Sequence, residues 1–183
     1  MGIELPGELA DVAAKAGARW PDADEDAMRE AAQAWRDTGR KVDALSGEAD
    51  GAAKDALRAV QGTAADAVRK HWDTFIKPDT GHLSAVSVGC DAAADRLDHA
   101  AEQIGAAKVE MLRSLVHLAR NIDAAHVAAA SGEPGALAGL DAAVRGTAVN
   151  VAHVYDTLVQ AVRKDSGVTV ADGAASMPVT RAA

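Results

Sequence analysis

The chain has 183 residues, enough for one domain with a hydrophobic core of its own. Its net charge of −8 argues against nucleic acid or an anionic membrane as the main partner, because both attract basic surfaces. The single cysteine excludes an internal disulfide and a thiolate metal site. Hydrophobic residues make up 49% of the chain but aromatic residues only 3%, a balance that favours alanine-rich helices packed closely together.

Two helices are predicted at the start of the chain. A short one lies between Pro6, which suits a first helical turn, and Gly17, which suits a helix end. The second covers about residues 23–45. Asp22 and Glu25 resemble a capping box, and acidic residues near a helix start interact favourably with the helix dipole.

The second predicted helix carries two rows of residues that repeat every seven positions. Such an a/d pattern predicts one buried helix face. Trp35 is therefore expected in the core, where its replacement by alanine should cost roughly 3–5 kcal/mol. The rows are Met28, Trp35 and Val42, and Ala31, Thr38 and Leu45.

A break at Ser46-Gly47 is expected to separate this helix from the next, over about residues 48–76. Gly62 falls inside that second pattern, where it would permit a close contact or a bend. Residues 77–81, with the sequence KPDTG, have the composition of a turn.

Trp72 and Phe75 lie three residues apart just before this turn, on one helical face. Two interpretations remain open. They could close one end of the core, or they could form an aromatic contact for a partner, the kind of residue enriched at interaction hot spots.

The longest predicted helix covers about residues 82–130. At 1.5 Å per residue it would span roughly 70 Å, which favours an elongated bundle. Lys108 falls in a second seven-residue row with Ala94, Ala101, Leu115 and Ile122. The main row is expected to form the core; it contains Cys90, Leu97, Ile104, Met111, Leu118 and Ala125.

A last helix is predicted over about residues 138–164, and it carries the only tyrosine, Tyr155. The sequence therefore predicts an all-α fold: an elongated antiparallel bundle of about four main helices, with a very long third helix and a short N-terminal one. We expect residues 1–164 to form this bundle and residues 165–183 to form a flexible tail. No signal peptide and no membrane-spanning helix are predicted.

No catalytic or cofactor-binding motif occurs in the chain. A di-iron bundle needs Glu-x-x-His on two helices, and the nearest match is the single pair Asp123 and His126. No glycine-rich phosphate loop is present. The expectation is a non-enzymatic protein without a cofactor or metal, and an enzyme or metal bundle is the weakest alternative.

Several motifs resemble the N-terminal WXG-like helical domain of CpnT-like toxins, the actinobacterial outer-membrane-channel and polymorphic toxin proteins of type VII secretion systems. The resemblance covers about residues 1–130. It rests on Ile3 to Pro6, Trp20-Pro21, the acidic run Asp24 to Asp26, Ala34-Trp35-Arg36, Trp72, Cys90, Leu97-Asp98 and Ala107-Lys108.

The resemblance implies a helical export or docking module that pairs with a second helical protein. In the broader WXG type, a turn tryptophan and a Tyr-x-x-x-acid element on the partner form a composite export signal. Here Thr74 stands where the Trp-x-Gly motif has glycine, and Val159 stands where the acid would follow Tyr155. A small partner would supply the missing half. The resemblance therefore implies that the partner or export contacts are Trp72, Thr74, Phe75 and Tyr155.

The leading hypothesis is a type VII secretion-associated module that exports or delivers a toxin or is itself a secreted partner. It would leave the cytoplasm by this non-Sec route. A homo- or heterodimer with a WXG-type partner, or a contact with the secretion machinery, is expected. The chain could be a free-standing paralogue, a delivery partner or the N-terminal part of a longer toxin. The alternative is a cytosolic helical adaptor or structural interaction protein.

Overall fold

The computed structural model describes residues 2–78 and 80–166. These residues form helices joined by short segments, and no strand occurs among them, as the all-α prediction requires. A 3₁₀ helix at Gly7–Leu9 precedes the first α-helix, and another at Pro134–Gly139 precedes the last. The α-helices are α1 (Ala10–Lys15), α2 (Glu25–Arg58), α3 (Thr63–Ile76), α4 (His82–Ala130) and α5 (Leu140–Ser166).

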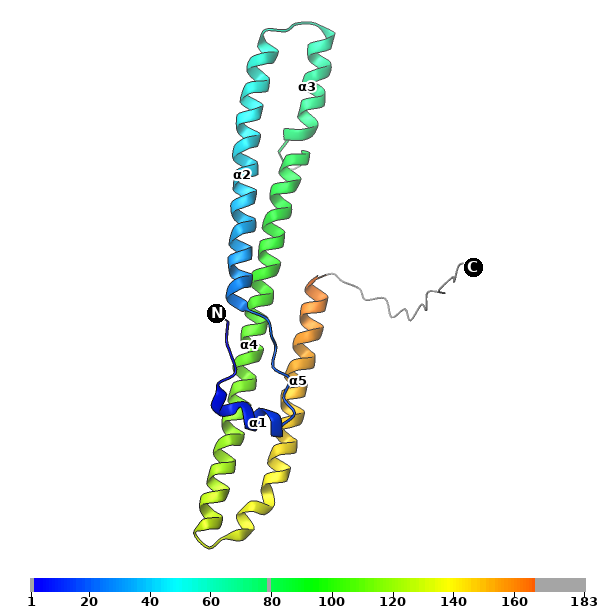
Figure 1. Cartoon of the computed structure of the whole chain (residues 1–183). Coiled ribbons are helices and arrows are strands. Elements are labelled where there is room, and N and C mark those ends of the chain that lie inside the picture. Colours follow the sequence, from blue (N-terminus) through cyan, green and yellow to red (C-terminus); the bar gives the residue numbers. More distant parts are fainter. Residues whose placement is uncertain (1, 79, 167–183) are drawn as a thin grey trace, which may run out of the picture.

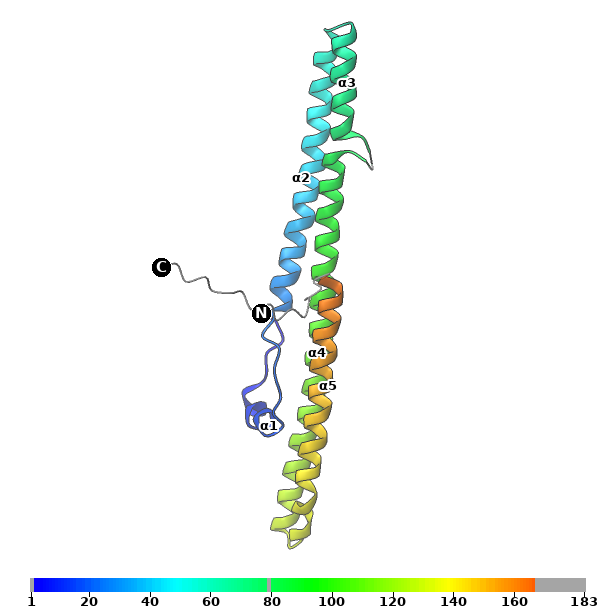
Figure 2. The same ribbon diagram turned by 90° about the vertical axis from the view of Figure 1, so that its right-hand side faces the viewer.

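The helices form a long, thin rod around α4 (Figure 1). Helices α3 and α4 follow one another almost in line, and α2 runs antiparallel beside both. Helix α5 runs antiparallel beside the other half of α4, so the rod is two main helices thick along much of its length (Figures 1 and 2). The antiparallel arrangement matches the prediction, but α2 and α5 cover different halves of α4.

Helix α2 begins near the predicted position, but its N-cap is Asp24 rather than Asp22 of the predicted capping box. The Asp24 carboxylate accepts hydrogen bonds from the backbone N–H groups of Asp26 at 3.0 Å and Ala27 at 3.1 Å. These bonds, chiefly the one from Ala27, lower the pKa of Asp24 below its ordinary value. The cap satisfies amide groups that have no partner inside the helix, which fixes the first turn of α2.

The predicted break at Ser46-Gly47 is wrong, because α2 continues without interruption to Arg58. The Ser46 hydroxyl donates a 2.7 Å hydrogen bond to the Val42 carbonyl, a bond compatible with a continuing helix. The chain reverses instead at Gly62, whose φ of 100° favours glycine. One long helix and a later turn therefore replace the two helices predicted around position 46.

The turn predicted at residues 77–81 separates α3 from α4 but does not reverse the chain (Figure 1). Gly81 is buried in this interruption, and a Cβ there would lie 2.6 Å from the Phe75 carbonyl oxygen. Only glycine fits such an approach without a shift of the backbone. Helix α4 then covers the residues predicted for the longest helix, and its 49 residues correspond to roughly 73 Å.

The best-buried cluster lies where the N-terminal segment crosses α4. Leu115 and Leu118 are almost completely buried there, against Leu9, Ala13 and Ala16. Val144 of α5 and other partly buried residues pack against the same cluster. Helix α5 extends to Ser166, two residues beyond the predicted end of the bundle. The rest of the predicted tail, residues 167–183, lies outside the described residues.

Candidate functional site

Helix α2 contacts α4 through a row of small or polar residues spaced by seven. Glu25, Ala32 and Gly39 are buried, and Ser46 continues the row partly buried; we call these four residues the α2 seam. A Cβ at Gly39 would lie only 3.3 Å from the Cβ of Cys90. Small side chains in the seam therefore let the two helix backbones approach closely.

Arg36 links α2 to α4 beside this seam. Its guanidinium donates hydrogen bonds to Asp98 Oδ2 at 2.6 Å and Asp95 Oδ1 at 2.7 Å. These bonds, first with Asp98 and then with Asp95, raise the pKa of Arg36 above its ordinary value. One cation thus holds two carboxylates that are one helical turn apart on α4.

Two further polar contacts follow along α2 at seven-residue steps. The Ser87 hydroxyl donates to Asp43 Oδ2 at 2.8 Å, and the Trp72 indole N–H donates to Asp50 Oδ1 at 3.2 Å. We call Arg36, Asp43 and Asp50 the polar ladder. Its three rungs reach α4 and α3 from one side of α2, because residues at seven-residue steps share one helix face.

The apolar rows predicted as the core face of α2 lie outside the seam. Trp35 is 46% exposed and Leu45 is 64% exposed, so the core position predicted for Trp35 is wrong. Trp35 is displaced about 60° from Ala32 and about 40° from Gly39 around the helix. We call the predicted rows, Met28, Ala31, Trp35, Thr38, Val42 and Leu45, the α2 stripe.

Most of the α4 residues that were predicted to form the core are buried. Leu97 is only partly buried, at the level where α2 and α4 pack. Ala125 is 9% exposed, and the remaining four are 4% exposed or less: Cys90, Ile104, Met111 and Leu118. Cys90 is therefore a buried thiol against Gly39 rather than an accessible nucleophile.

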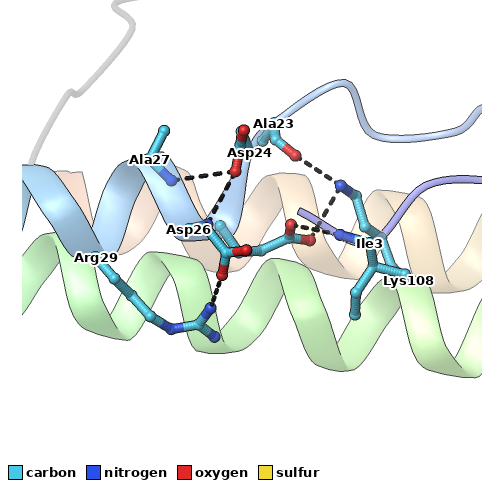
Figure 3. A network of polar contacts seen from close by, with 8 residues as sticks. Ile3, Ala23, Asp24, Asp26, Ala27, Arg29 and Lys108 are labelled. Atoms are coloured by element: carbon cyan, nitrogen blue, oxygen red, sulfur yellow. Dashed lines mark hydrogen bonds and ion pairs between the residues drawn. The ribbon is translucent and has the colours of Figure 1, made fainter. Parts of the chain in front are cut away.

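A buried ion pair joins the start of α2 to the middle of α4 (Figure 3). The side chains of Lys108 and Glu25 are 3% and 2% exposed, with Lys108 Nζ 3.0 Å from Glu25 Oε1. Nζ also donates to the Ala23 carbonyl at 2.6 Å, and the Ile3 N–H donates to Glu25 Oε2 at 3.1 Å. The Lys108 ammonium lies 5.9 Å from the centre of the Trp20 ring.

We call this group the N-terminal latch: Ile3, Trp20, Ala23, Glu25 and Lys108. It brings together, around one buried charge pair, four of the motifs that carried the sequence resemblance. A buried lysine and glutamate are tolerated only when each is paired and hydrogen-bonded. The latch therefore ties the N-terminal segment, α2 and α4 to one another.

The predicted contact residues at the end of α3 form an aromatic cluster around Phe75. The Phe75 ring lies 5.4 Å from His71, 6.2 Å from Trp72 and 5.5 Å from His82. Trp72 and Phe75 are both partly buried, whereas Thr74 is exposed and donates to the His71 carbonyl at 2.7 Å. The cluster thus joins α3 to the first residue of α4 and leaves part of both aromatic rings accessible.

Tyr155 is not brought near Trp72. It is partly buried on α5, with the Arg19 guanidinium 5.5 Å from the centre of its ring. Figure 1 places α3 beside the C-terminal half of α2 and α5 beside the opposite half of α4. Within one chain, therefore, these two residues do not form a single surface.

Among residues 2–78 and 80–166, no group of three or more His, Cys, Asp or Glu side chains could hold a metal ion. An apolar groove of about 350 Å³ does lie between α2 and α3. Leu57, Val60, Val68 and Trp72 line it together with alanines, and Val60 and Val68 remain about half exposed. The half of the rod that contains α3 therefore exposes apolar surface, and such surface suits binding to another protein.

Residues 4–155 match the family model of the WXG100 like domain. The chain belongs to the WXG100-like family. Proteins of this family are helical, are associated with type VII secretion and typically pair with helical partners. No curated protein and no solved structure matches the chain. Within the part of the chain that the structure describes, no helix is both long and apolar enough to cross a membrane.

In this WXG100-like chain the tryptophan motif lies away from the hairpin turn. The turn between α2 and α3 is at Gly62, whereas Trp72 is near the C-terminal end of α3. Thr74 takes the position of the motif's glycine and lies inside α3, two residues before its end. The helix therefore continues past the position where glycine would favour a turn.

Sequence reasoning missed the latch and the ladder. Lys108 had a visible signal, because it is the only charged residue in an otherwise apolar seven-residue row. The seven-residue spacing of Arg36, Asp43 and Asp50 was also visible, but polar residues at heptad spacing usually mark a solvated face. The close approach that makes these residues contacts depends on Gly39 and on tertiary packing.

Proposed function

We propose that this WXG100-like chain is a non-enzymatic module that binds a helical partner in CpnT-like type VII secretion. It would act in the export or delivery of a toxin, or as a secreted partner. The observation that carries the proposal is the α2 stripe. Its apolar residues lie beside the α2 seam, and Trp35 and Leu45 keep about half or more of their surface exposed.

The stripe suits a helix better than a strand or a loop. Apolar residues at seven-residue spacing match the periodicity of a second helix packed alongside. A half-exposed tryptophan at the centre of such a row is the kind of residue that dominates binding energy once a partner removes water from it. The apolar groove between α2 and α3 extends the same kind of surface toward the tip of the rod.

The aromatic cluster supports a second contact for the secretion machinery. Trp72 and Phe75 keep accessible surface, and Thr74 is exposed beside them. Tyr155 is distant and lies against Arg19, so a composite signal with Trp72 would need a second chain. The same separation favours the alternative, a cytosolic helical adaptor that is never exported.

Secretion is tested in the native host by deleting the ATPase of the type VII system. We expect the protein to disappear from the culture medium and to accumulate in the cell lysate, with a Sec-dependent protein as the control. Unchanged extracellular protein would reject export by this route. Its absence from the medium of the wild-type host would favour the adaptor.

Partner binding is tested by affinity capture from the same host, with Val149→Ala as a matched control. Val149 is 68% exposed on α5, outside the stripe. We expect the wild type and Val149→Ala to recover a small helical protein that Trp35→Ala fails to recover. Equal recovery by all three proteins would place the partner surface elsewhere.

A further inference from the structure

We propose that Arg36, Asp43 and Lys108 are positioning residues that hold α2 in the rotational phase in which its stripe faces outward. This inference rests on the proposed function for its biological meaning. Its structural content stands separately, because it concerns only which face of α2 is turned toward α4. A rotation of α2 would bury the α2 stripe against α4, where a partner could not bind it.

Helix α2 has two faces that compete for α4. The seam that packs there consists of Ala32, Gly39, Ser46 and the ionised Glu25. The stripe beside it contains larger apolar side chains, including Trp35. Because burial of apolar surface is favourable at about 25 cal/mol per Å², the hydrophobic effect alone would turn the stripe toward α4. Something other than apolar burial must therefore select the observed phase.

The polar contacts supply that selection. The two faces are separated by roughly 50°, and side-chain ends lie about 5–6 Å from a helix axis, so the rotation would move them by about 5 Å. Such a movement exceeds the length of any hydrogen bond in the ladder. The bonds from Arg36 to Asp98 and Asp95 and from Ser87 to Asp43 would all be lost.

The latch restrains the rotation most strongly. Exposed ion pairs contribute little on their own, and Asp95 is 73% exposed in its pair with Arg36. Lys108 and Glu25 are almost completely buried, so a rotation that separated them would leave two uncompensated charges inside the rod. The ladder thus aligns the middle of α2, while the latch fixes its N-terminal end.

The combination implies two arrangements of one helix pair. In the observed one the charged contacts are made and the stripe is available. In the other the stripe is buried against α4 and the charged contacts are broken. A helical partner that binds the stripe would stabilise the first arrangement, because a ligand shifts an equilibrium by its differential affinity.

The test uses protein labelled with 5-fluorotryptophan, whose three tryptophans give separate ¹⁹F signals. Single Trp→Phe variants assign the signals, and a soluble paramagnetic agent then broadens the signal of each exposed ring. The test variant combines Arg36→Gln with Glu25→Gln and Lys108→Met, so that no single buried charge is left unpaired. The control is Arg40→Gln, because Arg40 is 67% exposed and pairs within α2, with Asp37.

We expect the test variant to lose the paramagnetic broadening of Trp35 while its circular dichroism stays helical. Arg40→Gln should match the wild type in both measurements. Trp35 that remains as accessible as in the wild type would overturn the proposal. If the triple variant lost its helical signal, Glu25→Gln with Lys108→Met would carry the same test, because that pair removes the strongest restraint and leaves the ladder intact.

The fluorine measurement needs no partner, so it separates this inference from the proposed function. A masked Trp35 should also abolish capture of the helical partner in the triple variant. Failure of the wild type to capture any partner would reject the proposed function and leave the rotation result valid. Normal capture by a variant with masked Trp35 would reject the role of the stripe.

Discussion

Replacing Trp35 by alanine should affect association much more than folding. A fully buried tryptophan would cost roughly 3–5 kcal/mol on truncation. Trp35 is 46% exposed, so about half of that loss applies. Alanine also recovers about 0.5 kcal/mol of helix propensity. We therefore expect the free energy of unfolding to fall by about 1–2 kcal/mol, measured by urea denaturation followed by circular dichroism.

The effect on partner binding follows from the exposed part of the ring. A tryptophan presents at most about 250 Å², so a partner that covers the exposed 46% removes roughly 100 Å² from water. At about 25 cal/mol per Å² this corresponds to about 2.5 kcal/mol. The dissociation constant should rise roughly 70-fold in isothermal titration calorimetry with the captured partner.

The opposite pattern would refute this reasoning. Truncating a core side chain costs about 3 kcal/mol or more. A loss of that size in the free energy of unfolding, with unchanged affinity for the partner, would show that Trp35 is a core residue. Val149→Ala, on an exposed site of α5, should change neither quantity measurably. Equal losses of affinity in both variants would point to a general perturbation rather than a hot spot.

Three further perturbations probe the latch and the ladder. Lys108→Met should lower the free energy of unfolding by about 3–5 kcal/mol, because Glu25 keeps a buried charge, and adding Glu25→Gln should recover most of it in the same urea assay. Gly2→Ala should speed amide exchange at Ile3, since the added Cβ would clash with Glu25 Oε2; unchanged exchange would show that the segment adapts. Hydrogen bonds from Lys54 and from Trp72 lower the pKa of Asp50 below its ordinary value. An aspartate whose pKa is lowered on folding stabilises the protein above the unfolded pKa, and this stability is lost as pH falls through the folded pKa. The difference in the free energy of unfolding between wild type and Asp50→Asn should therefore shrink as pH falls below about 4. A constant gap would contradict a role for the ionised carboxylate.

The fold class and the bounds of α4 could be predicted because hydrophobic periodicity in α4 extends over several heptads. The break at Ser46-Gly47 was misplaced because an exposed mid-helix glycine costs only about 1 kcal/mol, which a long packed helix can absorb. The true turn depends on the positive φ of Gly62. That conformation is available to any glycine, so the sequence alone did not distinguish the two positions.

The orientation of α2 shows a different limit. Its periodicity identified an apolar face correctly, but it did not identify what covers that face. Small residues such as Gly39 can form the tighter contact because they let the backbones approach, and the side-chain bonds of Arg36 and Asp43 then add direction. A pattern of large apolar residues therefore predicts which helix face is apolar. Only the structure shows whether another element of the same chain packs against that face.

The two halves of the rod differ in the size of the residues that they bury. Where α5 and the N-terminal segment cover α4, large side chains such as Met111, Leu115 and Leu118 are 1% exposed or less. Where only α2 and α3 accompany α4, the residues with under 10% exposure are small. They are Ala32, Gly39, Ala65, Gly81, Ser87, Cys90 and Ala94.

Large apolar residues in this second half remain exposed, among them Trp35, Leu45 and Val86. Burial of large side chains is the main source of packing energy, so this half has the greater capacity to gain from a further helix. Helix α5 and the N-terminal segment already supply such cover to the first half. A helical partner is therefore best placed beside α2 and α4, in the half of the rod that α5 leaves open (Figure 1).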